Sequence, residues 1–506
     1  MSVGNLDTVR TNVRRDSPKR NGRGELPLSL DATQQALITQ LETSRESWQQ
    51  SGAYNPELYQ EPPAVRRRKG AALRKVLPHA AHGTWKPPRG RPSPVDIVIA
   101  GNAGRQQHLV LRMARMSASP FAFLRGGASV MAWDLSHTPV TGFQVIINGD
   151  AHINNFGLFG SLQREVIIDV NDFDEAMLGP WEWDLKRLVA SVNVAGRENG
   201  MTRRERRSAV MEAVAGYRFN ASRLSTMGLL DVWSLFGYAE RRPKLFKVPK
   251  KAWALIQKVV AKARATTGAS LLAKVAHRRH DGGWRFLEDP PVVTAIDAET
   301  REKVVASLVE YAEHLPPAYR FMLNRYGVAD IVHRVVGVGS VGSRAYLALL
   351  FGNGDDDPLF LQIKEATTPA HAPYLPAPPV RNTHEGSRVV GAQRILQSFG
   401  DPLLGYTTID GRPYYVRQMK NMKGSMPVPF MTGIPFNFWA FVCGGLLSRS
   451  HARSGDAARI AGYCGDGDTL DRALADFAEE YGDQTERDHA ELVQAIKRGR
   501  VKAAGE

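Results

Sequence analysis

Cysteine is nearly absent from this chain of 506 residues, which contains only two. Cys443 and Cys464 are too few for a disulfide framework or for a zinc site built from cysteines. Both fall in segments whose pattern is helical and partly apolar, which favours buried free thiols. Such thiols are the ordinary state of cysteine in a reducing cytoplasm.

Long apolar runs are also missing. The longest, near residues 436–447, is too short and contains too much glycine to cross a bilayer. A basic and then apolar signal sequence is not found at the N-terminus. Hydrophobic residues make up 43% of the chain, which is ordinary for a globular protein, and its length suffices for two or three domains. We therefore expect a cytoplasmic protein without a membrane span.

Acidic residues are outnumbered by basic ones, and the formal net charge is +15. About half of this excess lies in residues 1–95, which hold 16 Lys and Arg against 8 Asp and Glu. This stretch is rich in Pro, Gly and polar residues, and one helix is predicted over 32–50. Because interleaved aromatic residues are missing, we expect a solvated, partly disordered extension over residues 1–94. A contact of its densest basic run, 66–69, with nucleic acid or another polyanion is the alternative.

Residues 148–184 carry more chemistry than any other segment. A short apolar run at 145–147 predicts a buried strand that ends in a Gly-Asp turn containing Asp150 and Asn155. A second apolar run, at 166–170, leads directly into Asp172. We expect the two strands to form a hairpin that places these side chains at one end. Mg²⁺ prefers such oxygen ligands, completed by oxygens of the substrate.

The spacing within this segment resembles that of the protein kinase and aminoglycoside phosphotransferase superfamily. Asp150 and Asn155 stand five residues apart, as in the catalytic loop of that superfamily. Asp172 and Asp184 stand twelve apart, as do the first and last Asp of its metal-binding segment. The resemblance implies that Asp150 orients or deprotonates the acceptor hydroxyl and that Asn155 and Asp172 hold Mg²⁺. It also implies that Asp184 opens a buried helix behind the catalytic loop.

Two residues depart from that pattern. Asp174 replaces a Gly of the metal-binding motif, and Asn148 stands where His is usual.

The segment is also similar to a bacterial family known as domain of unknown function 2252, in the motifs GDAHINNFG, NDFDE and WDLKRL. This similarity extends over the chain from about Arg89 onward, and it leaves the substrate open.

A Gly-rich turn between two predicted strands follows much later in the chain. Apolar runs at 331–336 and 344–351 flank it, which argues against the strand-and-helix setting of a Rossmann motif. Such a turn is typical of a kinase-type loop whose backbone N–H groups lie over phosphates. Its glycines, which we assign to nucleotide binding, are Gly337, Gly339 and Gly342.

Lys364 ends the next predicted strand, where the superfamily has the Lys that contacts the nucleotide phosphates. The resemblance implies a carboxylate partner for it on the following helix, predicted over 384–399. Glu385 is our candidate for this partner, and Gln393 competes with it on the same helix. A strand at 414–419 then predicts the hinge beside the adenine of ATP.

These elements come in a rotated order, because in an ordinary kinase the Gly-rich loop and the Lys precede the catalytic loop. We therefore predict an α+β, two-lobed protein-kinase-like (phosphotransferase-like) fold with a circularly permuted chain, a mostly helical large lobe and a small antiparallel-sheet lobe. The predicted parts are the extension 1–94, the large lobe 95–330 with the catalytic and metal loops, the small nucleotide-binding lobe 331–430, and C-terminal helices 431–506 that complete the large lobe.

The predicted function is ATP- and Mg²⁺-dependent phosphoryl transfer to a small-molecule hydroxyl. Adenylyl transfer by the same elements and nucleotide binding by a regulator without turnover are alternatives. A metal-dependent hydrolase is another alternative, in which four acids and one His bind the metal directly. Its members would be Asp150, His152, Asp169, Asp172 and Asp174.

Overall fold

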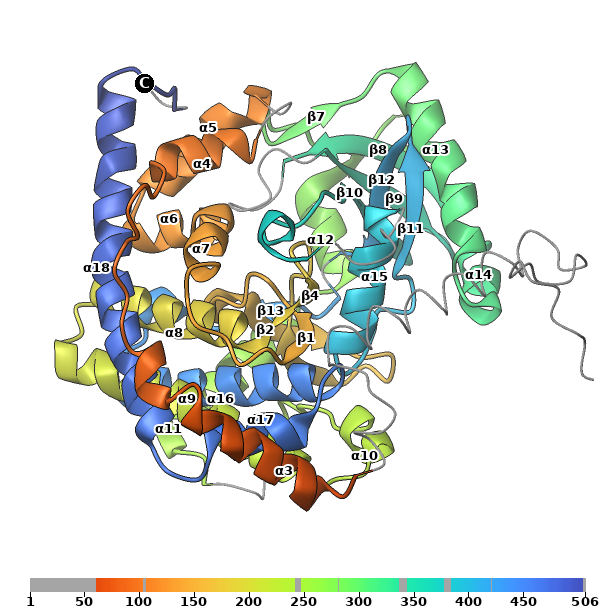
Figure 1. Cartoon of the computed structure of the whole chain (residues 1–506). Helices are drawn as coiled ribbons and strands as arrows, with labels where there is room; N and C mark the ends of the chain where they lie inside the picture. Colours follow the sequence, from red (N-terminus) through yellow and green to blue (C-terminus); the bar gives the residue numbers. More distant parts are fainter. Residues whose placement is uncertain are drawn as a thin grey trace, which may run out of the picture.

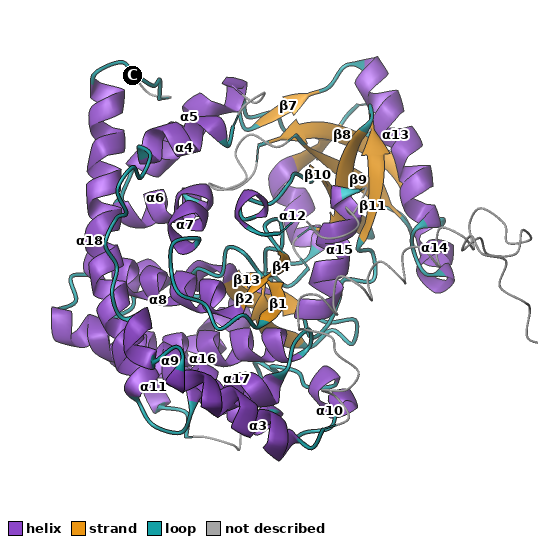
Figure 2. Ribbon diagram, viewed as in Figure 1, coloured by secondary structure: helices purple, strands orange, loops and turns teal. Residues whose placement is uncertain are grey.

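The structure is a computed structural model, and it describes most of the chain after residue 60. The described ranges are 61–102, 106–241, 247–280, 282–335, 344–376, 384–419 and 421–503, without the side chains of 106–108. The helices and strands form a mixed α+β fold with antiparallel sheets, which confirms the coarse fold class (Figures 1 and 2). The helix predicted over 32–50 and the glycines Gly337, Gly339 and Gly342 lie outside the described residues.

A six-stranded antiparallel sheet occupies one side of the molecule, at the right in Figure 1. Its strands in spatial order are β11 (Gly405–Ile409), β12 (Arg412–Gln418), β10 (Pro358–Glu365), β9 (Ala345–Phe351), β8 (Gly327–Arg334) and β7 (Val293–Ala295). Neighbouring residues of β9 face opposite cores: Leu350 packs with helix α13 (Ala298–Glu313), and Leu349 packs with helix α12 (Gly268–Val275). Both faces are covered, and this explains why the strands are nearly continuous apolar runs.

The helical part of the molecule surrounds α8 (Trp181–Glu198), which is buried along nearly its whole length. Helices α9 (Arg203–Leu224) and α16 (Gly433–Ala452) pack against each other and against α8. Glycine makes their close approach possible, because a Cβ on Gly444 of α16 would lie 1.9 Å from the carbonyl oxygen of Ala213 in α9. Small residues at this crossing therefore set the distance between the two helices.

Helix α18 (Thr469–Lys497) runs along the outside of the helical part, at the left in Figure 1. The sequence pattern predicts two helices here, at 470–481 and 484–497. The break between them is wrong, because Gly482 lies inside one continuous helix. A Cβ at Gly482 would lie 2.5 Å from Oδ1 of Asn193 in α8, so this glycine permits close packing rather than a turn.

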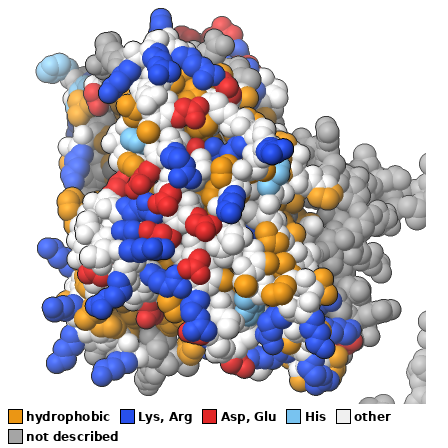
Figure 3. Space-filling model, turned by 60° about the vertical axis from the view of Figure 1, so that its left-hand side comes forward, with side chains coloured by type: hydrophobic (Ala, Val, Ile, Leu, Met, Phe, Trp, Pro, Cys, Tyr) orange, Lys and Arg blue, Asp and Glu red, His pale blue; other side chains and the backbone are white. Residues whose placement is uncertain are grey.

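Residues 61–94 are more ordered than the sequence pattern suggests. Helix α3 (Pro63–Ala72) packs against α17 (Ala457–Cys464), where Arg66 pairs with Asp456 at 2.7 Å and Arg67 pairs with Asp466 at 2.6 Å. Outside 32–50 the sequence pattern predicts an extended or mobile chain, and this is wrong for α3, which packs against residues nearly four hundred positions away. Two cations of the densest basic run are committed to ion pairs within the fold. On the face drawn in Figure 3, Lys and Arg side chains are interspersed with Asp and Glu.

The segment with the candidate site is carried by two small antiparallel sheets. Strand β1 (Gln144–Ile147) pairs with β4 (Met177–Pro180), and β3 (Val166–Val170) pairs with β2 (Phe156–Gly160), which in turn pairs with β13 (Gly424–Ser425). Both predicted strands exist, but the predicted hairpin between them is wrong. The Gly-rich strand β2, which has little strand propensity of its own, takes the place beside β3.

The remaining elements complete the described fold. The two cysteines are buried free thiols, as expected. No described helix is long and apolar enough to cross a membrane. The other helices are α4 (Pro94–Ala100), α5 (Gln106–Ser117), α6 (Pro120–Gly126), α7 (Ala128–Leu135), α10 (Leu229–Trp233), α11 (Lys250–Arg264), α14 (Pro317–Leu323) and α15 (Glu385–Leu396), with the short strands β5 (Ala276–Arg278) and β6 (Trp284–Phe286). Single 3₁₀ turns are η1 (Leu73–Lys75), η2 (His79–His82), η3 (Ile153–Asn155), η4 (Ala372–Tyr374) and η5 (Val428–Phe430).

Candidate active site

Strand β1 leads into the turn that carries Asp150. Gly149 has a φ of +76°, a left-handed conformation that favours glycine, and a Cβ there would lie 2.2 Å from the carbonyl oxygen of Glu175. The carboxylate of Asp184, in the first turn of α8, accepts hydrogen bonds from the backbone N–H groups of Asn148 (2.6 Å) and Gly149 (2.9 Å). The turn is therefore held by backbone geometry and by a buried carboxylate behind it.

Two further buried side chains hold Asp184 in place. Nε2 of His451 lies 3.1 Å from Oδ2 of Asp184, and the hydroxyl of Tyr217 lies 2.8 Å from Nδ1 of the same His. The Asp184 and His451 side chains are each only 1% exposed. Because these residues come from α8, α16 and α9, the packing of three helices determines where the turn lies.

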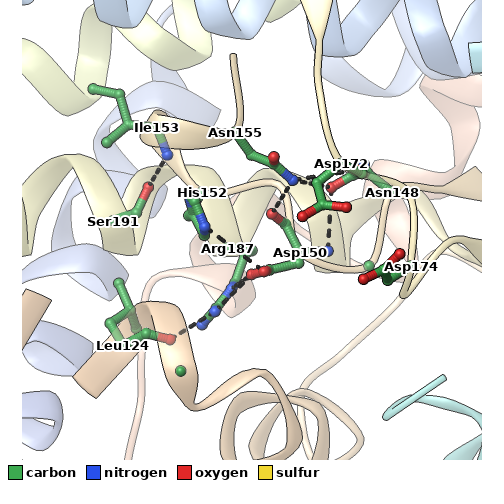
Figure 4. Close-up of polar contacts among 12 residues, drawn as sticks. Leu124, Asn148, Asp150, His152, Ile153, Asn155, Asp172, Asp174, Arg187 and Ser191 are labelled. Carbon is green, nitrogen blue, oxygen red and sulfur yellow. Dashed lines mark hydrogen bonds and ion pairs between the residues drawn. The ribbon is translucent and has the colours of Figure 1, made fainter. Parts of the chain in front are cut away.

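Asp150 itself is bound by Arg187, which follows Asp184 by three residues on α8. Arg187 donates hydrogen bonds to Oδ1 of Asp150 from Nη2 (2.7 Å) and from Nε (3.0 Å) (Figure 4). Burial raises the pKa of Asp150 to about 7, although the charge of Arg187 opposes the rise. A carboxyl group that titrates near neutrality is suited to take up and release a proton at physiological pH.

His152 lies beside this pair. Its Nε2 is 3.7 Å from Oδ2 of Asp150, and its side chain is 8% exposed. Burial, helped by the charges of Arg125 and Arg187, keeps the pKa of His152 well below its ordinary value. The imidazole is therefore neutral near pH 7, and Asp150 is the titrating member of the pair.

Asn155 ties the Asp150 turn to the loop that follows β3. Its Nδ2 donates to the carbonyl oxygens of Asp150 (3.0 Å) and Asp172 (3.3 Å) and to Oδ1 of Asn148 (3.2 Å) (Figure 4). Nδ2 of Asn148 also donates to the carbonyl of Asp172. Asn148, which departs from the superfamily pattern, thus bridges the two loops. Oδ1 of Asn155 accepts no hydrogen bond from a described residue, and this leaves an oxygen available to a cation.

The side chain of Asp172 lines a cavity of 380 Å³ between the six-stranded sheet and β2. Lys364, Arg417 and Lys423 line the same cavity. Burial alone would raise the pKa of Asp172, but the charges of these three cations outweigh burial and hold the pKa below its ordinary value. The cavity therefore combines an ionised carboxylate with an excess of positive charge. Such a combination fits a polyanion that binds together with a metal cation.

Lys364, near the end of β10, is 2% exposed and forms an ion pair with Asp174. Burial opposes the charge of this Lys, yet Asp174 and Asp172 outweigh burial and raise its pKa above the ordinary value. The partner predicted for Lys364 on the next helix is thus replaced by Asp174. This acid occupies the position at which the superfamily motif has Gly, so the departure from the motif supplies the counter-charge.

The two candidates on α15 lie in different places. Glu385, the first residue of the helix, pairs with Arg388 at 2.5 Å and lines a second cavity, of 910 Å³. Gln393 lines the same cavity as Asp172 and Lys364, and its Oε1 is buried without a hydrogen-bond partner among the described residues. Of the two candidates on α15, Gln393 is therefore the one that lines the cavity with Lys364.

The acids of the alternative hydrolase cluster do not converge. Asp169 lies apart in a buried ion pair with Arg449, and Asp174 is committed to Lys364. Across the described ranges, no group of three or more His, Cys, Asp and Glu side chains is arranged to hold a metal ion. The arrangement instead offers two oxygen donors, Asn155 and Asp172, with cations beside them.

Three basic residues of the cavity, Arg334, Arg417 and Lys423, are absent from the residues that the sequence indicated. Arg417 shares a face of β12 with Tyr415, which lies opposite Lys364 in the sheet register. Strand periodicity is the signal that could have identified Arg417. That signal needed the pairing of β12 with β10, which only the fold reveals.

Comparison with known proteins gives one match. A family model described as "Uncharacterized protein conserved in bacteria (DUF2252)" matches residues 105–495. No curated protein and no solved structure matches the chain.

Proposed function

The chain belongs to this bacterial family, whose description assigns no activity, and we propose a function from the site itself. The protein is an ATP- and Mg²⁺-dependent phosphotransferase that acts on a small-molecule hydroxyl. Its fold is that of a protein kinase in two lobes, with the chain circularly permuted so that the catalytic turn precedes the small lobe.

One observation carries the proposal. Asp172 and Lys364 lie far apart in the sequence, yet both line the cavity of 380 Å³. The sequence pattern alone indicates a nucleotide site for each of them, in segments nearly two hundred residues apart. Two chance assignments would not be expected to meet in one pocket together with Arg417 and Lys423, so their convergence supports a site for the phosphates of ATP.

The residues present fit a magnesium ion bound between protein and phosphates. Oδ1 of Asn155 and the carboxylate of Asp172 are hard oxygen donors, and Mg²⁺ commonly takes only one or two protein ligands beside substrate oxygens. When bound, the ion would neutralise charge on the phosphate groups. Lys364, Arg417 and Lys423 would contribute further positive charge on the same phosphates.

Asp150 would act on the acceptor. The acceptor hydroxyl gives its proton to the Asp150 carboxylate as its oxygen forms a bond to the γ-phosphorus, and the bond from that phosphorus to the β–γ bridging oxygen breaks to release ADP. Arg187 would hold the carboxylate in position for this proton transfer. The second cavity, of 910 Å³, is lined by Asp174 and Glu175 and is large enough to admit a small acceptor.

The order of the elements supports the permutation. Strands β8, β9 and β10 lie side by side in the six-stranded sheet, and β12, which pairs with β10, leads to the segment that lines the cavity with Gln418 and Met419. Helix α16 follows and packs behind the Asp150 turn through His451. In an unpermuted kinase, a helix after the hinge leads to the catalytic loop; here that loop comes earlier in the chain.

The Asp150–Arg187 pair favours one alternative, a nucleotide-binding regulator without turnover, because the ion pair competes with an acceptor for the carboxylate. Adenylyl transfer by the same residues would release pyrophosphate instead of ADP. The nature of the released product therefore separates the three functions.

The test is calorimetric binding of ATP in the presence of Mg²⁺ to the full chain. We expect Asp172→Ala and Lys364→Ala each to weaken binding by more than about tenfold, because each removes a charge from the phosphate site. The matched controls are Asp476→Ala and Lys303→Ala, which change exposed residues far from the cavity and should leave the affinity unchanged. A folded wild-type protein that binds no ATP would overturn the proposal.

A further inference from the structure

The C-terminal end of α6 is fastened beside the Asp150 turn. Nη2 of Arg187 donates to the carbonyl of Leu124 at 2.7 Å while it also binds Asp150 (Figure 4). Nη2 of Arg112 donates to the carbonyl of Gly126, also at 2.7 Å. The backbone on both sides of Arg125 is therefore fixed by hydrogen bonds, and one of the two donors, Arg187, also binds the proposed base Asp150.

Arg125 itself has no polar partner among the described residues. Among the residues that the structure describes, it takes part in no ion pair, and its Nε is buried without a hydrogen-bond partner. Neighbouring arginines differ, since Arg187 binds Asp150 and Arg388 binds Glu385. A half-buried guanidinium without a partner is costly, and proteins retain such groups where a ligand completes them.

The charges around Arg125 indicate where that ligand lies. Burial lowers the pKa of Arg125, and the carboxylates of Asp150 and Asp172 oppose the change. The same guanidinium lowers the pKa of His152. Arg125 is thus close enough to act on the base, on the metal-binding acid and on the His beside the base.

We infer that Arg125 binds the γ-phosphoryl group of ATP, an assignment that rests on the proposed function. In that function the acceptor oxygen lies at Asp150 and the phosphates lie at Asp172, so the transferred group lies between the two acids. The charge of Arg125 acts on both acids, and the carbonyl of the residue before it binds Arg187, which holds Asp150. Its planar fork of N–H donors suits the equatorial oxygens of a phosphoryl group, whose charge a well-placed arginine stabilises during transfer.

The assignment predicts discrimination between nucleotides that have a γ-phosphate and nucleotides that lack one. The probes are ADP and a hydrolysis-resistant ATP analogue with an imido bridge between the β- and γ-phosphorus atoms, each titrated with Mg²⁺ into the full chain by calorimetry. In Arg125→Ala, we expect affinity for the ATP analogue to fall by at least about tenfold and affinity for ADP to stay within about twofold of wild type. Arg125→Lys keeps the positive charge but loses the planar fork of donors. Its affinity for the ATP analogue should lie between those of wild type and Arg125→Ala.

Arg472→Ala is the matched control, because Arg472 is a half-exposed arginine of α18 that pairs with Asp468. It should leave both affinities unchanged. Thermal unfolding checks the fold: Arg125→Ala removes no ion pair with a described residue, so its Tm should stay close to that of wild type. If Arg125→Ala loses affinity equally for both nucleotides, or for neither, the assignment of Arg125 to the γ-phosphoryl group is overturned and the proposed function is unaffected. If wild-type protein binds neither nucleotide, the proposed function fails first.

Discussion

Asp150 and Asp172 are the same residue type, lie on neighbouring loops and are both partly buried, yet their pKa values shift in opposite directions. Burial raises the pKa of Asp150 to about 7, because desolvation and the charges of the acids Glu175 and Asp172 outweigh the opposing charge of Arg187. The pKa of Asp172 is lowered, because burial there is outweighed by several cations.

This difference assigns the two carboxylates to different chemistry. A group that titrates near pH 7 can exchange protons with a substrate, whereas one that stays ionised can bind a cation and balance bound phosphates. Pairs of acids whose environments separate their pKa values are a recurring sign of divided roles in an active site. Substitution of one acid at a time should therefore separate the two roles.

Removal of the Asp172 charge should have the largest effect. In Asp172→Asn, which keeps the size of the side chain, we expect affinity for ATP with Mg²⁺ to fall by more than about 100-fold, because a direct metal ligand is lost. Calorimetry measures the affinity, with Asp476→Asn as the exposed control. Binding that stays within a few-fold of wild type would show that Asp172 is not a metal ligand.

The corresponding change at the other acid should separate binding from chemistry. Asp150→Asn should bind ATP as wild type does, because Asp150 does not line the nucleotide cavity. The rate of ADP release, with water or an identified hydroxyl compound as acceptor, should fall by about 10²- to 10⁴-fold when the base is lost. An unchanged rate would remove Asp150 from the mechanism and favour a regulator.

In the wild-type protein, the rate of ADP release and the affinity for ATP should depend differently on pH. Because a base works in its deprotonated form, the rate of ADP release at saturating ATP should rise with pH and level off above the pKa of Asp150, which is about 7. Affinity for ATP should stay constant over the same range, since the lowered pKa keeps Asp172 ionised. A rate that falls as the pH rises through 7 would contradict the assignment of Asp150 as the base.

Local patterns predicted the parts of the site that depend on short stretches of chain. The five-residue spacing of Asp150 and Asn155 corresponds to a hydrogen bond from the Asn side chain to the Asp carbonyl. The amphipathic pattern over 298–313 predicts a helix, and α13 has these bounds, since apolar periodicity needs no partner to be visible. Both apolar runs around the catalytic segment became strands for the same reason.

Long-range pairing was beyond these patterns. The runs at 145–147 and 166–170 are equally apolar, and nothing in them states that each pairs with a different strand. Helix α3 likewise depends on a close approach of Gly70 to the backbone of Arg459, where a Cβ would lie 2.0 Å from the carbonyl oxygen. Such contacts arise from tertiary packing, which overrides local preference.

The choice between Glu385 and Gln393 as the α15 residue near Lys364 also depended on tertiary packing. Substitution of these two residues should have the smallest effect on ATP binding. Position along α15 alone did not decide between Glu385 and Gln393, because only the orientation of the helix against the sheet determines which one faces the cavity. Gln393 lines the nucleotide cavity with a buried oxygen to satisfy, so Gln393→Ala should weaken ATP binding by about two- to tenfold. Glu385→Ala, a matched change two turns earlier, removes a pair with Arg388 outside that cavity and should leave affinity within about twofold of wild type. The reverse order, measured by the same titration, would mean that α15 turns when nucleotide binds and that Glu385 reaches Lys364 after all.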